Sequence, residues 1–152
     1  NITDTVIKAI EPLQQLINNK NISIDFETDK DTIALYDEDR LVQVITNLLS
    51  NAIKFCPDND GTITIKVTNE NVGVIKIMVQ DNGKGIATGD MENIFDKFYQ
   101  SDNQNINKPI GSGLGLAISR QIIELHKGKI WAENVERGGA RLIFTLPKNI
   151  EK

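Results

Sequence analysis

The chain has 152 residues, 39% of them hydrophobic and 25% charged, and its 17 basic and 21 acidic side chains leave a net charge of −4. This size and composition predict one folded domain that needs no metal or disulfide to hold its core together. The acidic balance disfavours sequence-independent nucleic-acid binding, which requires clustered Lys and Arg. With one Cys and one His, a disulfide framework and multi-cysteine zinc sites are excluded. No apolar run approaches the roughly 18 residues of a membrane span. We therefore expect a cytoplasmic domain without direct membrane contact, either whole or cut from a larger protein.

The first part of the chain alternates helical and extended patterns. Apolar residues at helical spacing predict a helix over residues 1–20, capped by Thr3 or Asp4 and kinked or divided at Pro12. Alternation predicts a strand at 22–26, and a shorter extended stretch is expected at 33–36. Asp37 is expected to cap a long second helix with an apolar face. Two alternating runs then predict a hairpin of core strands, at residues 62–68 and 74–80.

After residue 80 the pattern loosens into a long polar segment, with a short helical piece expected at 91–98. A third helix is predicted at 112–125, followed by two strands at 129–133 and 140–146. Trp131, on the first of these strands, is more typical of a core residue than of a ligand platform. Together the elements predict an α+β two-layer sandwich, with helices on one face of a mostly antiparallel sheet. A long irregular segment in such a domain usually has a function.

The second helix carries a polar set of residues, Asn47, Asn51 and Lys54. Spacings of four and three place them on one helix face. Two amide oxygens one turn apart can help to coordinate Mg²⁺, which also uses waters and phosphate oxygens, and a Lys can contact a phosphate. Taken alone, the pattern fits a solvated helix face at least as well.

Two glycine-rich segments follow. Residues 81–86 (DNGKGI) come directly after a core strand, where an Asp can accept a hydrogen bond from an exocyclic amino group; alone, they read more often as a turn. Residues 111–116 (GSGLGL) run into a helix, where backbone N–H groups and the helix dipole favour an anion; a flexible helix entry is the alternative. The second segment matches neither a P-loop nor a good dinucleotide fingerprint.

These motifs and the segment FDKFY at 95–99, in this order, resemble the N, G1, F and G2 boxes of sensor histidine kinases. The similarity extends over nearly the whole chain. It implies one catalytic, ATP-binding domain over residues 1–152, with the Bergerat fold that gyrase, Hsp90 and MutL share. In that fold a mixed, mostly antiparallel sheet is covered on one face by about three helices. A mobile ATP lid is implied at residues 99–110.

The resemblance also implies the roles of the site residues. Asn47 and Asn51 would hold Mg²⁺ against the phosphates, Lys54 would contact phosphate, Phe55 would lie beside the purine, and Asp81 would accept from the adenine amino group. The remaining nucleotide-binding residues implied are Gly83, Gly85, Ile86, Tyr99, Lys108, Gly111, Ser112, Gly113, Leu114, Gly115 and Leu116. No residue is assigned to proton transfer. Many family members carry Arg directly after the F-box Tyr, where this chain has Gln100.

The implied activity is transfer of the ATP γ-phosphoryl group to a histidine on a separate dimerisation domain, within a two-component system that includes a response regulator. His126 lies at a helix end and is expected to be structural, not the acceptor. The isolated domain is expected to be monomeric and its parent a homodimer. Asn47 stands where related ATPases usually carry Glu, and an amide is no general base, so slow ATP hydrolysis is expected. Two alternatives stay open: a degenerate nucleotide-binding or interaction module, and an ATPase of the gyrase or Hsp90 kind.

Overall fold

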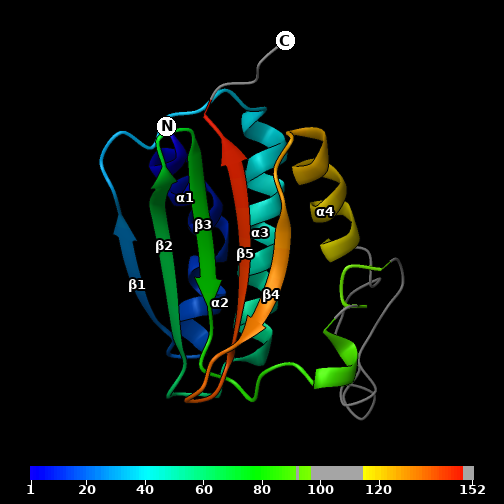
Figure 1. Ribbon diagram of the computed structural model, residues 1–152. Helices are drawn as coiled ribbons and strands as arrows, with labels where there is room; N and C mark the ends of the chain where they lie inside the picture. Colours follow the sequence, from blue (N-terminus) through cyan, green and yellow to red (C-terminus); the bar gives the residue numbers. More distant parts are fainter. Residues whose placement is uncertain (92, 97–114, 149–152) are drawn as a thin grey trace.

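A five-stranded sheet forms one layer of the molecule (Figure 1). The computed structural model describes residues 1–91, 93–96 and 115–148. The strand order is β1-β2-β3-β5-β4, with β1 parallel to β2 and every other neighbouring pair antiparallel. The predicted mixed, mostly antiparallel sheet is therefore confirmed. The strands are β1 (Ser23–Thr28), β2 (Thr62–Asn71), β3 (Val74–Gln80), β4 (Ile130–Asn134) and β5 (Ala140–Pro147).

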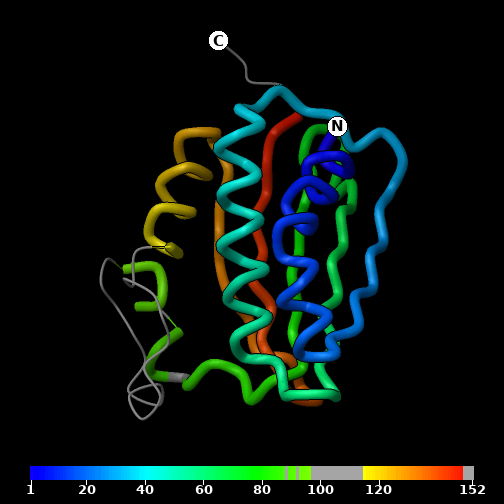
Figure 2. The backbone as a smooth tube through the Cα atoms, turned by 180° about the vertical axis from the view of Figure 1, so that it is seen from behind, coloured from blue at the N-terminus to red at the C-terminus, as the bar shows by residue number. Residues whose placement is uncertain are grey.

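The helices all cover the same face of this sheet, as the view from behind shows (Figure 2). They are α1 (Ile2–Ile10), the 3₁₀ turn η1 (Glu11–Leu13), α2 (Gln14–Asn19), α3 (Glu38–Phe55) and α4 (Gly115–Leu125), with a further 3₁₀ turn η2 at Thr88–Asp90. Pro12 lies in η1 and divides the first helix as predicted, because it cannot continue the α-helical hydrogen bonds. Within the described part of the chain, no helix has the length and apolarity needed to cross a membrane.

The core lies between the sheet and the helices. Alternate side chains of β2 and β3 point toward the helices, and α3 turns its apolar face to them. Each buried Ile or Leu contributes about 1.5–3 kcal/mol, so this interface dominates the stability of the fold. The buried residues of these three elements include Leu41, Val44, Ile45, Leu48, Leu49, Ile63, Ile65, Val67, Ile75, Ile77 and Val79.

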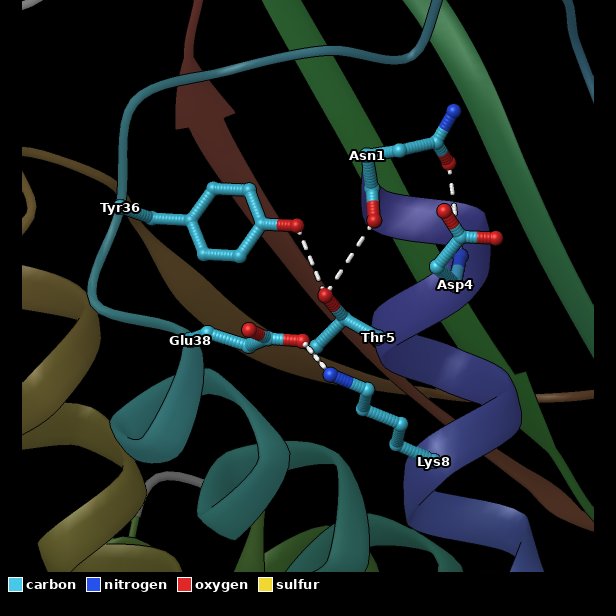
Figure 3. Close-up of polar contacts among 6 residues, drawn as sticks. All are labelled: Asn1, Asp4, Thr5, Lys8, Tyr36 and Glu38. Carbon is cyan, nitrogen blue, oxygen red and sulfur yellow. Dashed lines mark hydrogen bonds and ion pairs between the residues drawn. The ribbon is translucent and has the colours of Figure 1, made fainter.

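Polar contacts attach α1 to the start of α3 (Figure 3). The hydroxyl groups of Thr5 and Tyr36 lie 2.7 Å apart, and Lys8 forms an ion pair with Glu38. Asp37 caps α3 as predicted, since its side chain accepts a hydrogen bond from the first turn. The segment that precedes α3 is therefore attached to α1 through Tyr36 and to the first turn of α3 through Asp37.

Several local predictions were wrong. The cap of α1 is Asn1, whose side chain accepts from the Asp4 amide, in place of Thr3 or Asp4. Residues 33–36, where only an extended stretch was expected, pass from β1 to α3 without a pairing partner in the sheet, so that expectation is not among the errors. Of the helix expected at 91–98, the described residues 91 and 93–96 form turns and a bend.

Trp131 also differs from its predicted place. Ile130 and Ala132 pack against the core, so the alternation of β4 turns Trp131 to the sheet face away from the helices. There it is half-buried, and its indole N–H donates to Glu133 at 3.1 Å.

Candidate nucleotide site

The first predicted set lies on α3, and one member contacts α4. The side-chain nitrogen of Asn47 donates to the carbonyl of Gly115 at 3.0 Å and lies 3.2 Å from the Ser119 hydroxyl. Because a carbonyl only accepts, the amide orientation is determined, and Oδ1 is the atom that Asn47 can offer to a cation. Asn51 follows one turn later and is half-buried. The face of α3 that carries Asn47 and Asn51 is therefore only partly exposed to solvent.

At its end, α3 meets the first glycine-rich segment. Lys54 places its ammonium group 5.0 Å from the centre of the Phe55 ring, and partial burial lowers the pKa of Lys54. A Cβ on Gly83 would lie 2.2 Å from the Phe55 carbonyl oxygen. Only glycine allows this approach, which packs residues 81–86 against the last turn of α3.

Asp81 follows β3 directly and is 5% exposed. Its Oδ1 accepts from the Gly83 amide at 2.8 Å and from the Ala140 amide at 3.4 Å. Burial raises the pKa of Asp81, and the two backbone donors act in the opposite direction. Both hydrogen bonds use Oδ1, which leaves Oδ2 available to accept a bond from a ligand. Asp81 is thus a buried acceptor held in place by backbone groups.

The rest of the 81–86 segment is attached to the end of β4. Asn134 accepts from the Ile86 amide at 2.8 Å and donates to the Ile86 carbonyl at 2.7 Å. Gly85 has φ +82°, and a Cβ there would lie 2.9 Å from the Asn134 side chain. The sequence analysis missed Asn134, because a partner 48 residues away leaves no local pattern.

A second missed contact is the approach of the β4–β5 turn to the end of β3. Gly139 has φ +103°, and a Cβ there would lie 2.1 Å from the Asp81 carbonyl oxygen. The glycine pair at the turn was visible in the sequence, but its approach to Asp81 is a tertiary contact that no periodicity indicates.

The second glycine-rich segment is described only from Gly115 onward. Gly115 begins α4 beside Asn47, and the Leu116 side chain is half-buried against the core. The other predicted residues of this segment and of the lid lie outside the described residues: Tyr99, Lys108, Gly111, Ser112, Gly113 and Leu114.

The oxygens of the Asn47, Asn51 and Asp81 side chains fit what Mg²⁺ and a nucleotide need. The described residues contain no group of three or more His, Cys, Asp or Glu side chains able to hold a metal by themselves. The oxygens of Asn47 and Asn51, one turn apart on α3, instead fit an ion that takes most of its ligands from water and phosphate. Oδ2 of Asp81, with backbone closely packed by Gly83 and Gly85, fits one edge of a flat polar base.

A separate hollow of about 470 Å³ lies between α4 and β4. Its lining includes Met91, Phe95, Ile130 and Trp131, together with an ion pair on α4. It contains none of the predicted nucleotide-binding residues, so the two surfaces are distinct.

Comparisons with known proteins agree with this arrangement. Residues 36–150 match the family described as histidine kinase-, DNA gyrase B- and HSP90-like ATPases. The chain is 39% identical over 125 residues to the sensor histidine kinase WalK of Bacillus subtilis, which covers 82% of the chain and 20% of WalK. It is also 35% identical over 147 residues to the adaptive-response sensory kinase SasA of Synechocystis. The aligned region makes up 96% of this chain and 38% of SasA.

Among solved structures, the chain is similar to the catalytic domain of the histidine kinase ThkA. The TM-score is 0.85 at 33% identity, over 99% of this chain and 96% of the ThkA domain. The chain therefore matches a solved domain over nearly its full length, while it spans 20% and 38% of the two curated relatives. It belongs to the histidine kinase-, DNA gyrase B- and HSP90-like ATPase family, as a catalytic, ATP-binding domain of the sensor histidine kinase type.

Proposed function

We propose that the domain binds Mg·ATP between α3, residues 81–86 and the start of α4, and transfers the γ-phosphoryl group to a histidine on a separate domain. The observation that supports this most strongly is the pair formed by Asp81 and Asn47. Backbone groups hold each of them so that one oxygen is left for a ligand. Asn47 lies eight residues before the end of α3, about 12 Å along its axis, and that end contacts Gly83. This separation suits a ligand with a base at one end and phosphates at the other.

Each side chain has a distinct task in this proposal. Asp81 accepts from the exocyclic amino group of adenine and so selects it over guanine, whose 6-oxo group is itself an acceptor. Asn47 and Asn51 provide amide oxygens for Mg²⁺, and Lys54 reaches a phosphate as a point charge. When bound, Mg²⁺ neutralises charge on the phosphates. The lid at 99–110 and the donors of residues 111–116 remain predictions that complete the phosphate end.

The proposed reaction relies on positioning rather than on proton transfer by this domain. A lone pair on an acceptor imidazole nitrogen forms the new P–N bond while the bond from the γ-phosphorus to the bridging oxygen breaks, and ADP leaves with that electron pair. Asn47 cannot remove a proton from water, because an amide is not basic at neutral pH. Hydrolysis of ATP should therefore be slow without an acceptor.

The proposal includes two macromolecular partners. One is a histidine-bearing dimerisation domain of a homodimeric parent kinase, and the other is a response regulator that takes the phosphoryl group onward. Support for the second comes from a similar solved structure, described as ThkA in complex with the response regulator protein TrrA, with a TM-score of 0.81 and 33% identity. This chemistry draws on the ATP of the cytoplasm, which is where we place the domain.

A labelling experiment tests the proposed function. The domain is incubated with Mg²⁺ and ATP labelled at the γ-phosphate, with and without a histidine-bearing dimerisation domain from the WalK relative. We expect acid-labile label on the added domain, none on this chain, and no transfer when the acceptor histidine is replaced by Ala. ATP binding without any transfer would favour a degenerate binding module. Rapid phosphate release without an acceptor would favour an ATPase.

A further inference from the structure

One imidazole joins the end of α4 to the start of α3. Nδ1 of His126 lies 2.8 Å from the Ile122 carbonyl oxygen, and the backbone N–H of Asp37 donates to Nε2 at 3.1 Å. A carbonyl only accepts, so Nδ1 must carry the proton, and Nε2 then has the lone pair that Asp37 requires. The two contacts together specify the Nδ1–H tautomer, with Nε2 as the acceptor.

The position of this ring is determined by the way α4 ends. Lys127 has φ +65°, the Gly128 amide donates to the Ile123 carbonyl at 2.9 Å, and the Lys127 amide donates to the Glu124 carbonyl at 3.0 Å. This is the Schellman arrangement of a helix end. A Cβ on Gly128 would lie 1.9 Å from the carbonyl oxygen of a β5 residue, so the helix end is also packed tightly on the sheet. His126 is therefore presented to α3 from a rigid support.

The two helices lie side by side (Figures 1 and 2). Among the described residues, hydrogen bonds join α4 to α3 or its cap at two places, here called ties, and the contact at His126 is the second of them. The first is the hydrogen bond from Asn47 to Gly115. Asn47 is ten residues beyond Asp37, so the two ties are about 15 Å apart along α3. Two ties at this spacing define how α4 is shifted and tilted against α3 more closely than the Asn47 tie and the apolar packing of α4 would alone.

We propose that His126 is a positioning residue for nucleotide binding, which through the Asp37 amide keeps the start of α4 aligned with Asn47. The inference rests on the proposed function, since Asn47 and Gly115 belong to the phosphate end of that site. Residues 81–86 are attached to β4 and to the last turn of α3, not to α4. Loss of the tie should therefore weaken contacts to phosphates and Mg²⁺ and leave base recognition intact.

The test compares His126→Phe, which keeps a ring and loses both hydrogen bonds, with Lys127→Gln, an exposed neighbour. Calorimetric titration should show Mg·ATP binding weakened about three- to tenfold in His126→Phe alone, the range expected for one hydrogen bond. Adenosine, which has no phosphates, should bind both variants as it binds the unmodified chain. Nitrogen NMR should show Nδ1 protonated in the unmodified chain, and the Asn47 side-chain amide signal should shift in His126→Phe.

A second pair of variants covers the case in which His126→Phe does not fold. Asp37 has φ −79°, which proline accepts, so Asp37→Pro removes the donor N–H, and Asp37→Ala removes only the helix cap. Mg·ATP should bind more weakly to Asp37→Pro than to Asp37→Ala.

Four results would each overturn the inference alone, with the unmodified chain binding Mg·ATP normally. Two concern Mg·ATP affinity: no change in His126→Phe, or equal affinity of the two Asp37 variants. The others are equal weakening of ATP and adenosine binding, and a His126 ring protonated at Nε2. Failure of the unmodified chain to bind Mg·ATP would instead overturn the proposed function, and the inference with it.

Discussion

Replacing Asp81 with Asn should separate nucleotide binding from folding. The amide is nearly the same shape, and its oxygen can take over the Oδ1 bonds from the Gly83 and Ala140 amides at 2.8 and 3.4 Å. Its nitrogen then occupies the place of Oδ2 and presents a donor where the proposal requires an acceptor. The adenine amino group, also a donor, would lose its partner.

The size of the effect follows from the burial of this group. A hydrogen bond to a buried charged acceptor, once left unmade, costs about 1–3 kcal/mol, which corresponds to about a 5- to 150-fold rise in the Kd for ATP. The preference for ATP over GTP should shrink as well, because the new donor can face the 6-oxo group of guanine.

The stability of the nucleotide-free domain should not fall with ATP affinity in Asp81→Asn. Burial raises the pKa of Asp81 in the folded state, so the folded chain binds its proton more tightly than the unfolded chain does. The stability that this group provides is therefore complete below the unfolded pKa of about 3.9 and is lost as pH rises through the folded value. At pH 7 the buried charge opposes folding, and Asp81→Asn should not lower the melting temperature of the nucleotide-free domain.

Titration calorimetry with ATP and GTP, together with thermal unfolding of the nucleotide-free protein, measures both effects. The reasoning would be refuted by equal affinity of the unmodified domain for ATP and GTP, or by an Asp81→Asn variant that binds ATP normally. Loss of binding accompanied by a large drop in melting temperature would also contradict it, because Asp81 would then be a structural residue.

Other variants test the packing, the metal and the pH dependence. Gly83→Ala should lower the melting temperature by about 2–10 °C, because its Cβ would overpack against Phe55. Gly89→Ala has open space around it and should leave the melting temperature unchanged. Equal melting temperatures of the two variants would contradict the close contact at Gly83. Asn51→Ala should weaken ATP binding more in the presence of Mg²⁺ than in its absence. Ser50→Ala, at an exposed position, should leave the ATP affinity unchanged under both conditions, as calorimetric titration can show. Burial raises the pKa of Tyr36, so stability should fall as pH rises above about 10, and denaturant titrations should show a smaller fall for Tyr36→Phe.

Much of the fold was predictable because its causes are local. Alternating side chains at 62–68 and 74–80 became β2 and β3, and Asp37 became the cap of α3, since each pattern is determined by neighbours a few residues away. The same alternation could have placed Trp131 outside the core, because Ile130 and Ala132 on either side of it face the helices.

The contacts that shape the site were harder to predict because they are long-range. Asn134 and Ile86 pair across 48 residues, and nothing in either local sequence indicates the other. The orientation of the Asn47 amide depends on the Gly115 carbonyl, 68 residues away. The ordered motifs indicated segments that the fold brings together at the end of α3, but the hydrogen bonds that orient Asn47 and Asp81 follow only from the assembled backbone.

Mapping the backbone and side-chain amide NMR signals during titration with Mg·ATP tests the central claim most directly. Among the described residues, the proposed nucleotide site and the hollow between α4 and β4 share no member. The account predicts that the largest shifts fall on Asn47, Asn51, Gly83 and Ile86. Shifts concentrated instead around Phe95 and Ile130, in the hollow between α4 and β4, would contradict it.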